Sequence, residues 1–473
     1  MGSFAAFLKR QGMNVTGSDQ NVYPPMSDVL GRAGITLFSG YREENLTGLP
    51  KRPDLVVIGN VISRANPEAT AAISGGYPYT SLPEAMEKLM LKSTRNLVVS
   101  GTHGKTTTSS FLAFILSHAG KDPNYFIGGV SADLPNSFHV TSLSGGRPFV
   151  LEGDEYDTAF WDKVPKFNHY LPDDAILTSV EFDHADIYAD FNAVKSAFSG
   201  LVSRIRKGGR LIACADSVAV RELAAQAVVP VLFYGSNVES GARFTPSKIR
   251  VDQNGITRFT VLDGEKEMGE LALHLPGHHN VLNALAVWIE CRELGLSHAE
   301  IAAGLLAFRG VKRRQEERGE VGGVLVIDDF AHHPTAVRET LRALRSKYKD
   351  RRIVAVFEPR SATSRRKVFQ EDYGKAFLEA DSCHIAVPFD QSKIAENDQF
   401  SSQQLVDDIV RLGRPADFFL EIEQGVKQVT ASSKRGDLIA VLSNGGFGGF
   451  IPKLLDALRD RALDAPDHRS PPC

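Results

Sequence analysis

Residues 97–108 read Leu-Val-Val-Ser-Gly-Thr-His-Gly-Lys-Thr-Thr-Thr, an apolar run followed by a glycine-rich turn and the start of a helical pattern. In this setting the backbone N–H groups of the turn and the N-terminus of the helix face an anion, and the lysine adds a positive charge. The match to the usual phosphate-loop pattern is incomplete, because Val99 occupies the first glycine position. The stretch Gly101–Thr108 still predicts a phosphate loop, in which Lys105 contacts the phosphates and Thr106 offers its hydroxyl to Mg²⁺.

On either side of this loop, short apolar runs alternate with helical patterns, which is typical of α/β proteins with parallel, doubly wound sheets. The chain has 473 residues, a length that predicts roughly three domains. We expect a first domain over residues 1–93, a central domain over 94–309 and a third domain over 310–473. The polar, proline-rich tail from about residue 465 is expected to be disordered.

Apolar runs of strand length predict the buried strands of these domains, at Asn14–Gly17, Leu55–Ile58, Leu97–Val99, Phe149–Leu151, Ala175–Val180, Val324–Ile327, Ile353–Phe357, His384–Val387 and Leu438–Leu442. Helical patterns are predicted at Phe4–Gln11, Lys105–Ala119, Asn280–Leu294 and Thr335–Lys347. The segment Phe244–Leu275 instead has the alternation and the turn residues of antiparallel strands.

Two predicted strands of the central domain end in acidic residues. Glu152 follows the first of them, and Glu181-Phe-Asp-His184 follows the second. Because the carboxyl ends of parallel strands line the ligand crevice, we expect Glu152 and His184 to meet the Mg²⁺–phosphate assembly from two strands. Carboxylates are common Mg²⁺ ligands and histidine is a rarer one. An acidic cluster alone is more often a solvated loop, so this interpretation depends on the neighbouring phosphate loop.

Two further motifs bear on ligand binding. Asn280, in Pro276-Gly-His-His-Asn280, is best explained as a helix N-cap, although Asn280 and Asn283 together also suit the edge of a purine. The motif Asp328-Asp-Phe-Ala-His-His-Pro334 follows a predicted strand, and its acidic and imidazole groups suit a ligand cleft between domains.

A basic segment follows the next predicted strand of the third domain. It carries Arg360, Arg365 and Arg366, whose guanidinium groups are able to hold a carboxylate through paired hydrogen bonds. The competing interpretation is a solvated basic loop, and the sequence favours neither.

Composition and charge exclude several classes of protein. Hydrophobic residues make up 42% and charged residues 23%, as in ordinary globular proteins, and the net charge of −3 argues against a nucleic-acid or membrane partner held by bulk electrostatics. The cysteines, Cys214, Cys291, Cys383 and Cys473, are too far apart for a zinc knot or a disulfide framework. No apolar run approaches the ~18 residues that span a bilayer, and the N-terminus lacks signal-peptide features. We therefore expect a cytoplasmic protein with free thiols.

Taken in order, the motifs resemble those of the Mur ligase family over nearly the whole chain. Gly-Thr-His-Gly-Lys-Thr-Thr at 101–107, Pro-Gly-His-His-Asn at 276–280 and Asp-Asp-Phe-Ala-His-His-Pro at 328–334 are similar to the branch that accepts UDP-N-acetylmuramate. The segments 152–160, 181–186, 357–366 and 443–449 resemble its peptide-accepting members. The resemblance implies a three-domain α/β fold, with a Rossmann-like N-terminal domain for the UDP-sugar, a central P-loop-type ATPase domain, and a Rossmann-like C-terminal domain for nucleotide and peptide.

The same resemblance implies an ADP-forming carboxylate–amine ligase that uses ATP and Mg²⁺. The lactyl carboxylate of UDP-N-acetylmuramate is activated as an acyl phosphate, and the amine of L-alanyl-γ-D-glutamyl-meso-diaminopimelate attacks it, in peptidoglycan recycling. One alternative is ligation of free L-alanine, which Ser361 disfavours because that enzyme has an arginine there. Another is a nucleotide-sugar-binding protein that has lost catalysis. The oligomeric state is not predicted.

By resemblance, the residues of the site divide by ligand. The catalytic residues are Lys105, Glu152, His184 and Asp329, and the metal ligands are Thr106, Glu152 and His184. The ATP-binding residues are Gly101, Thr102, Gly104, Lys105, Thr106, Thr107, Asn280, Asn283, Arg314 and Asp329. The substrate-binding residues are Asp19, Ser63, Arg64, Asn66, His103, Glu155, His332, Arg360 and Arg366. The family's leading strand is expected to be missing, because Met1-Gly-Ser3 already resembles the end of the turn that follows it.

Overall fold

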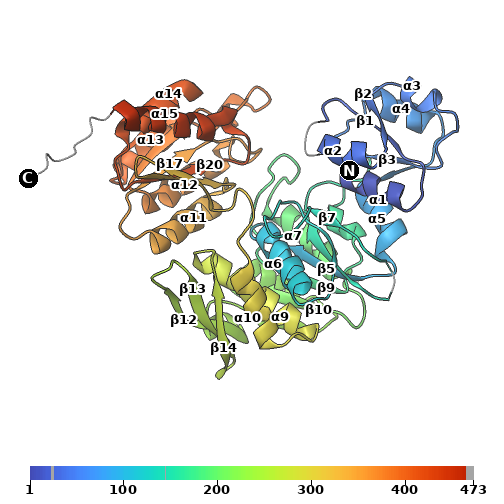
Figure 1. The fold of residues 1–473 in the computed structure, drawn as a ribbon, viewed down its shortest axis with the longest axis horizontal. Helices are drawn as coiled ribbons and strands as arrows, with labels where there is room; N and C mark the ends of the chain where they lie inside the picture. The colour runs from blue at the N-terminus through green and yellow to red at the C-terminus, as the bar shows by residue number, and fades with distance from the viewer. Residues whose placement is uncertain (23–25, 144, 465–473) are drawn as a thin grey trace, which may run out of the picture.

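Three regions, each with its own β-structure, follow one another along the chain (Figure 1). The computed structural model describes residues 1–22, 26–143 and 145–464. The first region, in blue, and the third, in orange to red, lie on opposite sides of the middle region in this view (Figure 1). This is the three-domain α/β architecture that the motifs predict.

Some expectations concern the chain as a whole. Cys214, Cys291 and Cys383 are buried free thiols, as predicted, whereas Cys473 and the predicted disordered tail lie outside the described residues. Among the described residues, no helix has both the length and the apolar character needed to cross a membrane.

The first region contains two separate pairs of parallel strands, β1–β2 and β3–β4, instead of one continuous sheet. The predicted strand at Asn14–Gly17 begins later than expected, because the pairing with β2 starts at Thr16 and ends at Asp19. The helices and strands of this region are α1 (Gly2–Arg10), β1 (Thr16–Asp19), α2 (Met26–Arg32), β2 (Thr36–Ser39), α3 (Glu44–Thr47), β3 (Val56–Ile58), α4 (Pro67–Ser74), β4 (Tyr79–Ser81), α5 (Leu82–Met86) and the π-helical turn η1 (Glu87–Leu91).

The middle region is built on a ten-stranded mixed sheet with the order β14-β13-β12-β11-β10-β9-β5-β8-β6-β7. Strands β12 to β14 form the predicted antiparallel segment, while β5 and its neighbours are parallel. Its strands are β5 (Arg95–Ser100), β6 (Asn124–Phe126), β7 (Phe138–His139), β8 (Pro148–Gly153), β9 (Asp174–Leu177), β10 (Arg210–Cys214), β11 (Val231–Tyr234), β12 (Phe244–Val251), β13 (Thr257–Asp263) and β14 (Lys266–Leu273). Its helices are α6 (Lys105–His118), α7 (Phe191–Val202), α8 (Val218–Ala224), α9 (His278–Glu293) and α10 (His298–Ala307), with short turns at η2 (Lys166–His169) and η3 (Val238–Ser240).

Both faces of the parallel part of this sheet are covered by helices. Leu97 and Val99 of β5 pack into the core formed with α6, α9 and α10, whereas Val98 packs into the core formed with α7 and α8. Successive side chains of a strand point to opposite faces, so a strand buried on both sides reads as a continuous apolar run. This is why β5, β8 and β9 were predictable from the sequence, although the buried strand β10 was not predicted.

A buried carboxyl pair lies at the start of these strands, at the opposite end from the phosphate loop. Glu290 of α9 is fully buried next to Asp174 of β9, which forms an ion pair of 2.7 Å with Arg95. Burial and Asp174 hold the pKa of Glu290 well above its usual value, although Arg210 and Arg95 oppose the shift. Glu290 is therefore protonated over a pH range in which the unfolded chain is ionised.

Replacing Glu290 by glutamine should make the protein less sensitive to pH. A carboxyl with a raised pKa stabilises the fold fully below its unfolded value of about 4.5, and this contribution is lost as the pH rises toward the folded pKa. The wild type should thus lose up to ~1.4 kcal/mol per pH unit over that range through this group, and Glu290→Gln should not. Urea unfolding at pH 5 and pH 8 measures both. Glu293→Gln, on the same helix with its side chain 44% exposed, should behave like the wild type, and equal pH slopes for all three would contradict this account.

The third region has a six-stranded sheet with the order β15-β16-β20-β17-β18-β19, parallel except for β15. Its strands are β15 (Glu316–Val321), β16 (Val324–Asp329), β17 (Ile353–Phe357), β18 (Ser382–Ala386), β19 (Ala416–Phe419) and β20 (Leu438–Leu442). Its helices are α11 (Pro334–Lys347), α12 (Gln370–Ala376), α13 (Ser402–Arg411), α14 (Ile422–Ser432) and α15 (Phe450–Asp464), with short turns at η4 (Lys367–Phe369), η5 (Phe377–Glu379), η6 (Glu396–Asp398) and η7 (Phe447–Gly449).

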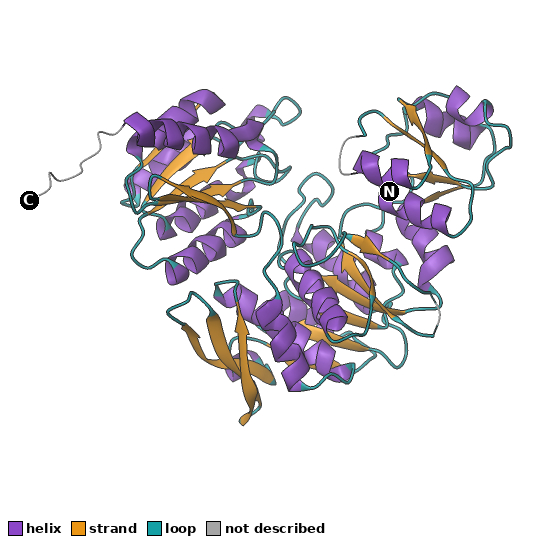
Figure 2. Ribbon diagram, viewed as in Figure 1, coloured by secondary structure: helices purple, strands orange, loops and turns teal. Residues whose placement is uncertain are grey.

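Helices cover both faces of this third sheet (Figure 2). Leu325 and Ile327 of β16 pack into the core with α11, α12 and α13, whereas Val324 and Val326 pack into the core with α14 and α15. The two edge strands, β15 and β19, were not predicted. β15 reads Glu-Glu-Arg-Gly-Glu-Val, a charged segment that resembles a loop, and such residues are common on edge strands because they discourage pairing with other chains.

Candidate active site

The predicted phosphate loop joins the end of β5 to the start of α6. Two of its glycines have positive φ angles, +136° at Gly101 and +82° at Gly104, which side chains rarely tolerate. A Cβ atom on Gly101 would stand 2.2 Å from Oγ1 of Thr178, and one on Gly104 would stand 2.7 Å from Oδ1 of Asn283. Both glycines are therefore required by backbone conformation and by space.

The segment after β9 holds this loop in place. The N–H of Thr102 donates to the carbonyl of Ser179 at 2.9 Å, and the N–H of His103 donates to the Ser179 hydroxyl at 3.0 Å. Thr178 donates its hydroxyl to the carbonyl of His103 at 2.5 Å. Sequence reasoning missed Thr178 and Ser179. The available signal was a pair of hydroxyl residues between a buried strand and an acidic motif.

Lys105, at the first position of α6, lies in a carboxylate-rich environment. Its side chain is 15% exposed, and its Nζ donates to the carbonyl of Gly101 at 2.7 Å and to Oε1 of Glu155 at 3.0 Å. Burial lowers the pKa of Lys105, but the carboxylates of Glu155 and Asp154 outweigh that effect and leave the pKa raised. The ammonium group is therefore fully charged at neutral pH, as a phosphate ligand must be.

Glu155 joins Lys105 to His184. Its side chain is 2% exposed, and Oε1 also contacts Nε2 of His184 at 2.9 Å. Burial lowers the pKa of His184, but the contact with Glu155 raises it above its usual value. Glu155 was predicted to bind substrate. In this structure its contacts are those of a buried counter-ion to the phosphate loop.

Thr106 and Glu152 form the oxygen-rich part of the site. The hydroxyl of Thr106 donates to Oε1 of Glu152 at 2.7 Å, and the N–H of Gly128 donates to Oε2 at 2.7 Å. A hydroxyl and a carboxylate are hard oxygen ligands that suit Mg²⁺. The structure brings these two predicted metal ligands together, while the third, His184, is hydrogen-bonded to Glu155 instead.

A cavity of about 280 Å³ opens beside Glu152, between the first and middle regions. Its lining is mixed, with apolar walls and a few polar groups, and consists of Met1, Asn60, Leu82, Pro83, Phe126, Gly128, Glu152, Asp154, Thr158, Lys166 and Tyr170. Lys166 forms an ion pair of 2.5 Å with Asp154 there. The cavity provides space for a polar ligand next to the proposed Mg²⁺ carboxylate.

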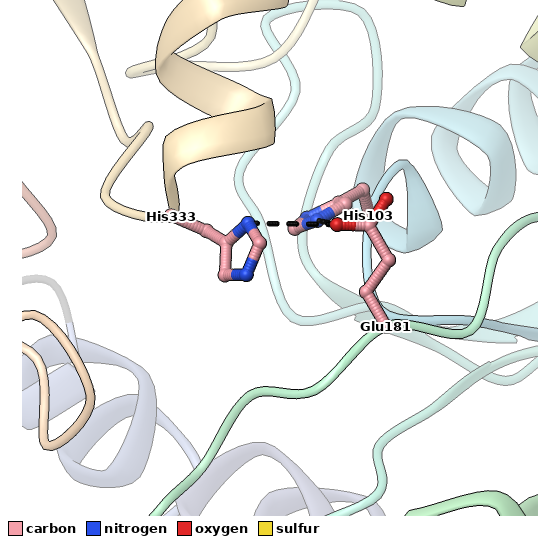
Figure 3. Close-up of side chains that lie close together, drawn as sticks. All are labelled: His103, Glu181 and His333. Atoms are coloured by element: carbon pink, nitrogen blue, oxygen red, sulfur yellow. Dashed lines mark ion pairs between the residues drawn. The ribbon is translucent and has the colours of Figure 1, made fainter. Parts of the chain in front are cut away.

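The acidic segment after β9 also reaches the third region. Thr363 donates its hydroxyl to Oδ1 of Asp183 at 2.6 Å, and Thr335 donates to Oε2 of Glu181 at 2.7 Å. His333 contacts the carbonyl of Phe182 at 3.2 Å. Figure 3 shows His333 beside His103 of the phosphate loop and Glu181. Of the two adjacent histidines, His333 thus lies at the phosphate loop, while the predicted His332 lies 3.9 Å from Asp183.

Asp329, predicted to contact the nucleotide, is 3% exposed at the end of β16. Its carboxylate accepts hydrogen bonds from the N–H groups of Gln315 and Ala331, each at 2.7 Å. Burial raises its pKa above the usual value, opposed by Arg314. In this structure the carboxylate therefore positions the backbone just before the neighbouring strand β15 and the backbone just after its own strand.

The predicted N-cap at Asn280 is wrong. Helix α9 begins at His278, with Gly277 as its cap, so Asn280 lies inside the first turn and donates to the carbonyl of Pro276 at 2.8 Å. The cap position needs a φ of +102°, which favours glycine over asparagine. Asn283, one turn further, packs against Gly104 of the phosphate loop.

The predicted sugar-binding residues of the first region lie in loops and at element ends. Asn66 is the N-cap of α4 and accepts a hydrogen bond from the N–H of Ala69 at 3.0 Å. Ser63 and Arg64 are exposed just before it, and Asp19 ends β1. None of these four is among the residues that line the cavity beside Glu152, so their role remains a prediction.

The arginines predicted to face the peptide are engaged with acidic side chains. Arg360 pairs with Glu358 at 3.2 Å and lies over the ring of Phe389, and Arg366 pairs with Asp398. Arg365 donates to the carbonyl of Asp390. The segment is therefore neither a free anion site nor a solvated basic loop in this structure.

A three-domain fold with a phosphate loop, a hydroxyl and a carboxylate beside it, and a third domain that contacts the segment holding that loop is the arrangement expected of a ligase that activates a carboxylate with ATP. Three family models match the chain: the Mur ligase family catalytic domain over residues 1–94, the Mur ligase middle domain over 99–290 and the glutamate ligase domain over 313–445. The chain belongs to the Mur ligase family, whose members are ATP-dependent.

Its relatives include the UDP-N-acetylmuramate–L-alanyl-γ-D-glutamyl-meso-2,6-diaminoheptandioate ligase of Escherichia coli K12, 38% identical over 98% of this chain and 96% of the relative. The UDP-N-acetylmuramate–L-alanine ligase of Carboxydothermus hydrogenoformans is 33% identical over 96% of this chain and 94% of that enzyme. Among solved structures, a murein peptide ligase from Psychrobacter arcticus 273-4 matches with a TM-score of 0.69 and 33% identity, over 97% of this chain and 96% of that one.

Proposed function

We propose that this protein joins the lactyl carboxylate of UDP-N-acetylmuramate to the amine of L-alanyl-γ-D-glutamyl-meso-diaminopimelate, with hydrolysis of ATP to ADP, in peptidoglycan recycling. The observation that carries the proposal is the phosphate loop at Gly101–Gly104, which lies next to Glu152 and a cavity large enough for part of a sugar. The identity with the Escherichia coli enzyme supports the choice of acceptor. Both nucleotide substrates are intracellular metabolites, so we place the reaction in the cytoplasm.

In this mechanism the chain binds and orients two anions. The N–H groups of the loop and the ammonium group of Lys105 hold the phosphates of ATP, with Thr102 and Thr107 in the same turn. Thr106 and Glu152 would hold Mg²⁺, which when bound supplies charge neutralisation to the transferring phosphoryl group. The muramate carboxylate takes the γ-phosphoryl group from ATP and becomes an acyl phosphate. The peptide amine then attacks that carbonyl, and phosphate leaves.

Other residues complete the proposed assignment. Asn280, Asn283, Arg314 and Asp329 serve the nucleotide, and His184 supports the phosphate loop through its contact with Glu155, which also accepts a hydrogen bond from Lys105. Asp19, Ser63, Arg64, Asn66 and His103 serve the UDP-sugar, while His332, Arg360 and Arg366 serve the peptide. For the two arginines this requires that the peptide carboxylates exchange with Glu358 and Asp398 as ion-pair partners.

Phosphate release with paired substrates tests the proposal. With ATP, Mg²⁺ and UDP-N-acetylmuramate, we expect kcat/KM to be at least ~10-fold higher with the tripeptide than with L-alanine, because a site that recognises polar groups of a substrate strongly rejects analogues that lack them. Omission of the sugar nucleotide is the control for background ATP hydrolysis. Faster release with L-alanine would instead assign the activity of the Carboxydothermus relative. ATP binding without release with either amine would indicate a nucleotide-sugar-binding protein.

A further inference from the structure

Three metal-binding side chains from two domains converge between the phosphate loop and α11 (Figure 3). Nε2 of His103 lies 3.4 Å from Oε2 of Glu181, and Nδ1 of His333 lies 3.7 Å from the same oxygen. One ligand atom from each of the three lies within 4.8 Å of the others. Neither Thr106 nor Glu152, the proposed Mg²⁺ ligands, belongs to this cluster.

His333 presents one nitrogen to the cluster in a defined tautomer. Its Nε2 faces the carbonyl of Phe182 at 3.2 Å and must donate to it, so Nδ1 carries the lone pair. Metal-binding histidines are usually held in this way, by a hydrogen bond from the other ring nitrogen to a carbonyl or carboxylate. The N–H of Thr335 points to the same Nδ1 at 3.3 Å, a long bond that a metal ion would replace.

His103 and Glu181 have free capacity for a ligand. Nε2 of His103 is buried, and within the described part of the chain its 3.4 Å contact with Oε2 of Glu181 does not have the geometry of a hydrogen bond. A buried polar atom without a well-aligned hydrogen bond is uncommon in folded proteins and calls for an explanation. Oε2 of Glu181 accepts a hydrogen bond from Thr335, and a carboxylate oxygen has a second lone pair for a metal.

Two side chains of the cluster have pKa values below their usual ones. Burial and the neighbouring His103 lower the pKa of His333 to about 4. Burial opposes ionisation of Glu181, but His103, His333 and Thr335 lower its pKa to about 2.

We propose that His103, Glu181 and His333 form a zinc site that ties the phosphate loop to the start of α11. Two imidazoles and one carboxylate are a common zinc ligand set, and imidazole does not suit Mg²⁺. Tetrahedral zinc with bonds of about 2.0–2.2 Å places its ligand atoms roughly 3.3–3.5 Å apart. The two distances to Glu181 are already close to that value, so binding needs mainly a small approach of the two histidines. A fourth position is open to water.

The test uses the full-length protein with excess Mg²⁺, so that the phosphate loop's own metal site is saturated. Zinc binding is measured by equilibrium dialysis, and Co²⁺ alone is used as a spectroscopic probe. We expect one tight equivalent of zinc and the intense visible bands of tetrahedral Co²⁺, which zinc should abolish. If the wild-type protein shows only the weak bands of octahedral Co²⁺, this result alone overturns the proposal and no variant is needed.

Two variants locate the site. His103→Gln and His333→Asn should each weaken zinc binding at least ~10-fold, since loss of even a supporting residue commonly has that effect. Asparagine retains the ability to cap α11 at position 333. His118→Gln, at an exposed position on α6, and His332→Gln should bind zinc like the wild type. Wild-type affinity in both cluster variants, with metal-free melting temperatures unchanged, would place the zinc elsewhere and contradict the proposal.

Discussion

Lys105→Met should reduce kcat for phosphate release by at least ~100-fold, because the variant removes the only ammonium group that the structure places inside the described phosphate loop. Charge on the transferring phosphoryl group is stabilised mainly by positioned cations, and removal of one such group is costly in a partly buried site. Lys105→Arg should recover little activity, since the planar guanidinium cannot occupy the space of a compact ammonium group between Gly101 and Glu155.

The control for this experiment is Lys163→Met. Lys163 forms an ion pair of 2.7 Å with Asp157 but is 66% exposed, and we expect kcat to stay within about twofold of the wild type. Loss of Lys105 also leaves Glu155 with His184 as its remaining side-chain partner, so some stability, on the order of 1–3 kcal/mol, should be lost. Assays are therefore run well below the melting temperature. Retention of more than a tenth of wild-type kcat in Lys105→Met would exclude the proposed role.

Gly101→Ala should abolish phosphate release and lower the free energy of unfolding by about 2–6 kcal/mol. The substitution combines backbone strain at a φ of +136°, about 1–3 kcal/mol, with a steric clash of similar cost. The clash cannot be relieved by one rotamer change, since backbone atoms of Ser179 lie 2.9 Å from the new Cβ. Urea unfolding and phosphate release measure the two effects separately.

Gly120→Ala is the matched control, because Gly120 follows the other end of the same helix. Its φ is +72°, and a Cβ there meets nothing within 4 Å. Only the backbone strain remains, so we expect a loss of about 1–2 kcal/mol with unchanged activity. If Gly101→Ala were no more harmful than Gly120→Ala, the close packing of the loop against the segment after β9 would not be essential.

The sequence predicted β5, β8, β9 and the phosphate loop because their signals are local, but it missed the buried strand β10 and its neighbour β11. A strand buried on both faces is a continuous apolar run, and the glycines and lysine of the loop have one dominant use after such a strand. The edge strand β15 was missed because its charged residues indicate that it is exposed to solvent but do not indicate that it pairs with another strand. The pairing is decided by β16, which lies beside it.

The contacts within the site were harder to predict because they depend on which side chains meet across strands. His184 follows β9 as expected, whereas Glu152 lies within β8, one residue before its end. The two side chains have different partners, because His184 contacts Glu155, which also accepts a hydrogen bond from Lys105. The choice between His332 and His333 is set just before α11, where His333 is the N-cap with an extended backbone and successive side chains point to opposite sides. The order of the residues in the sequence does not tell which of the two histidine side chains points toward the phosphate loop.

The segment Thr178–Asp183 contacts the phosphate loop on one side and Thr335 and Thr363 of the third region on the other. Two binding events that bias the same structural element are thermodynamically linked. If nucleotide binding changes the preferred orientation of the third domain, then a ligand that fixes that domain must change nucleotide affinity by the same factor. Under that condition, this short connection would make the use of ATP depend on binding of the ligand that fixes the third domain.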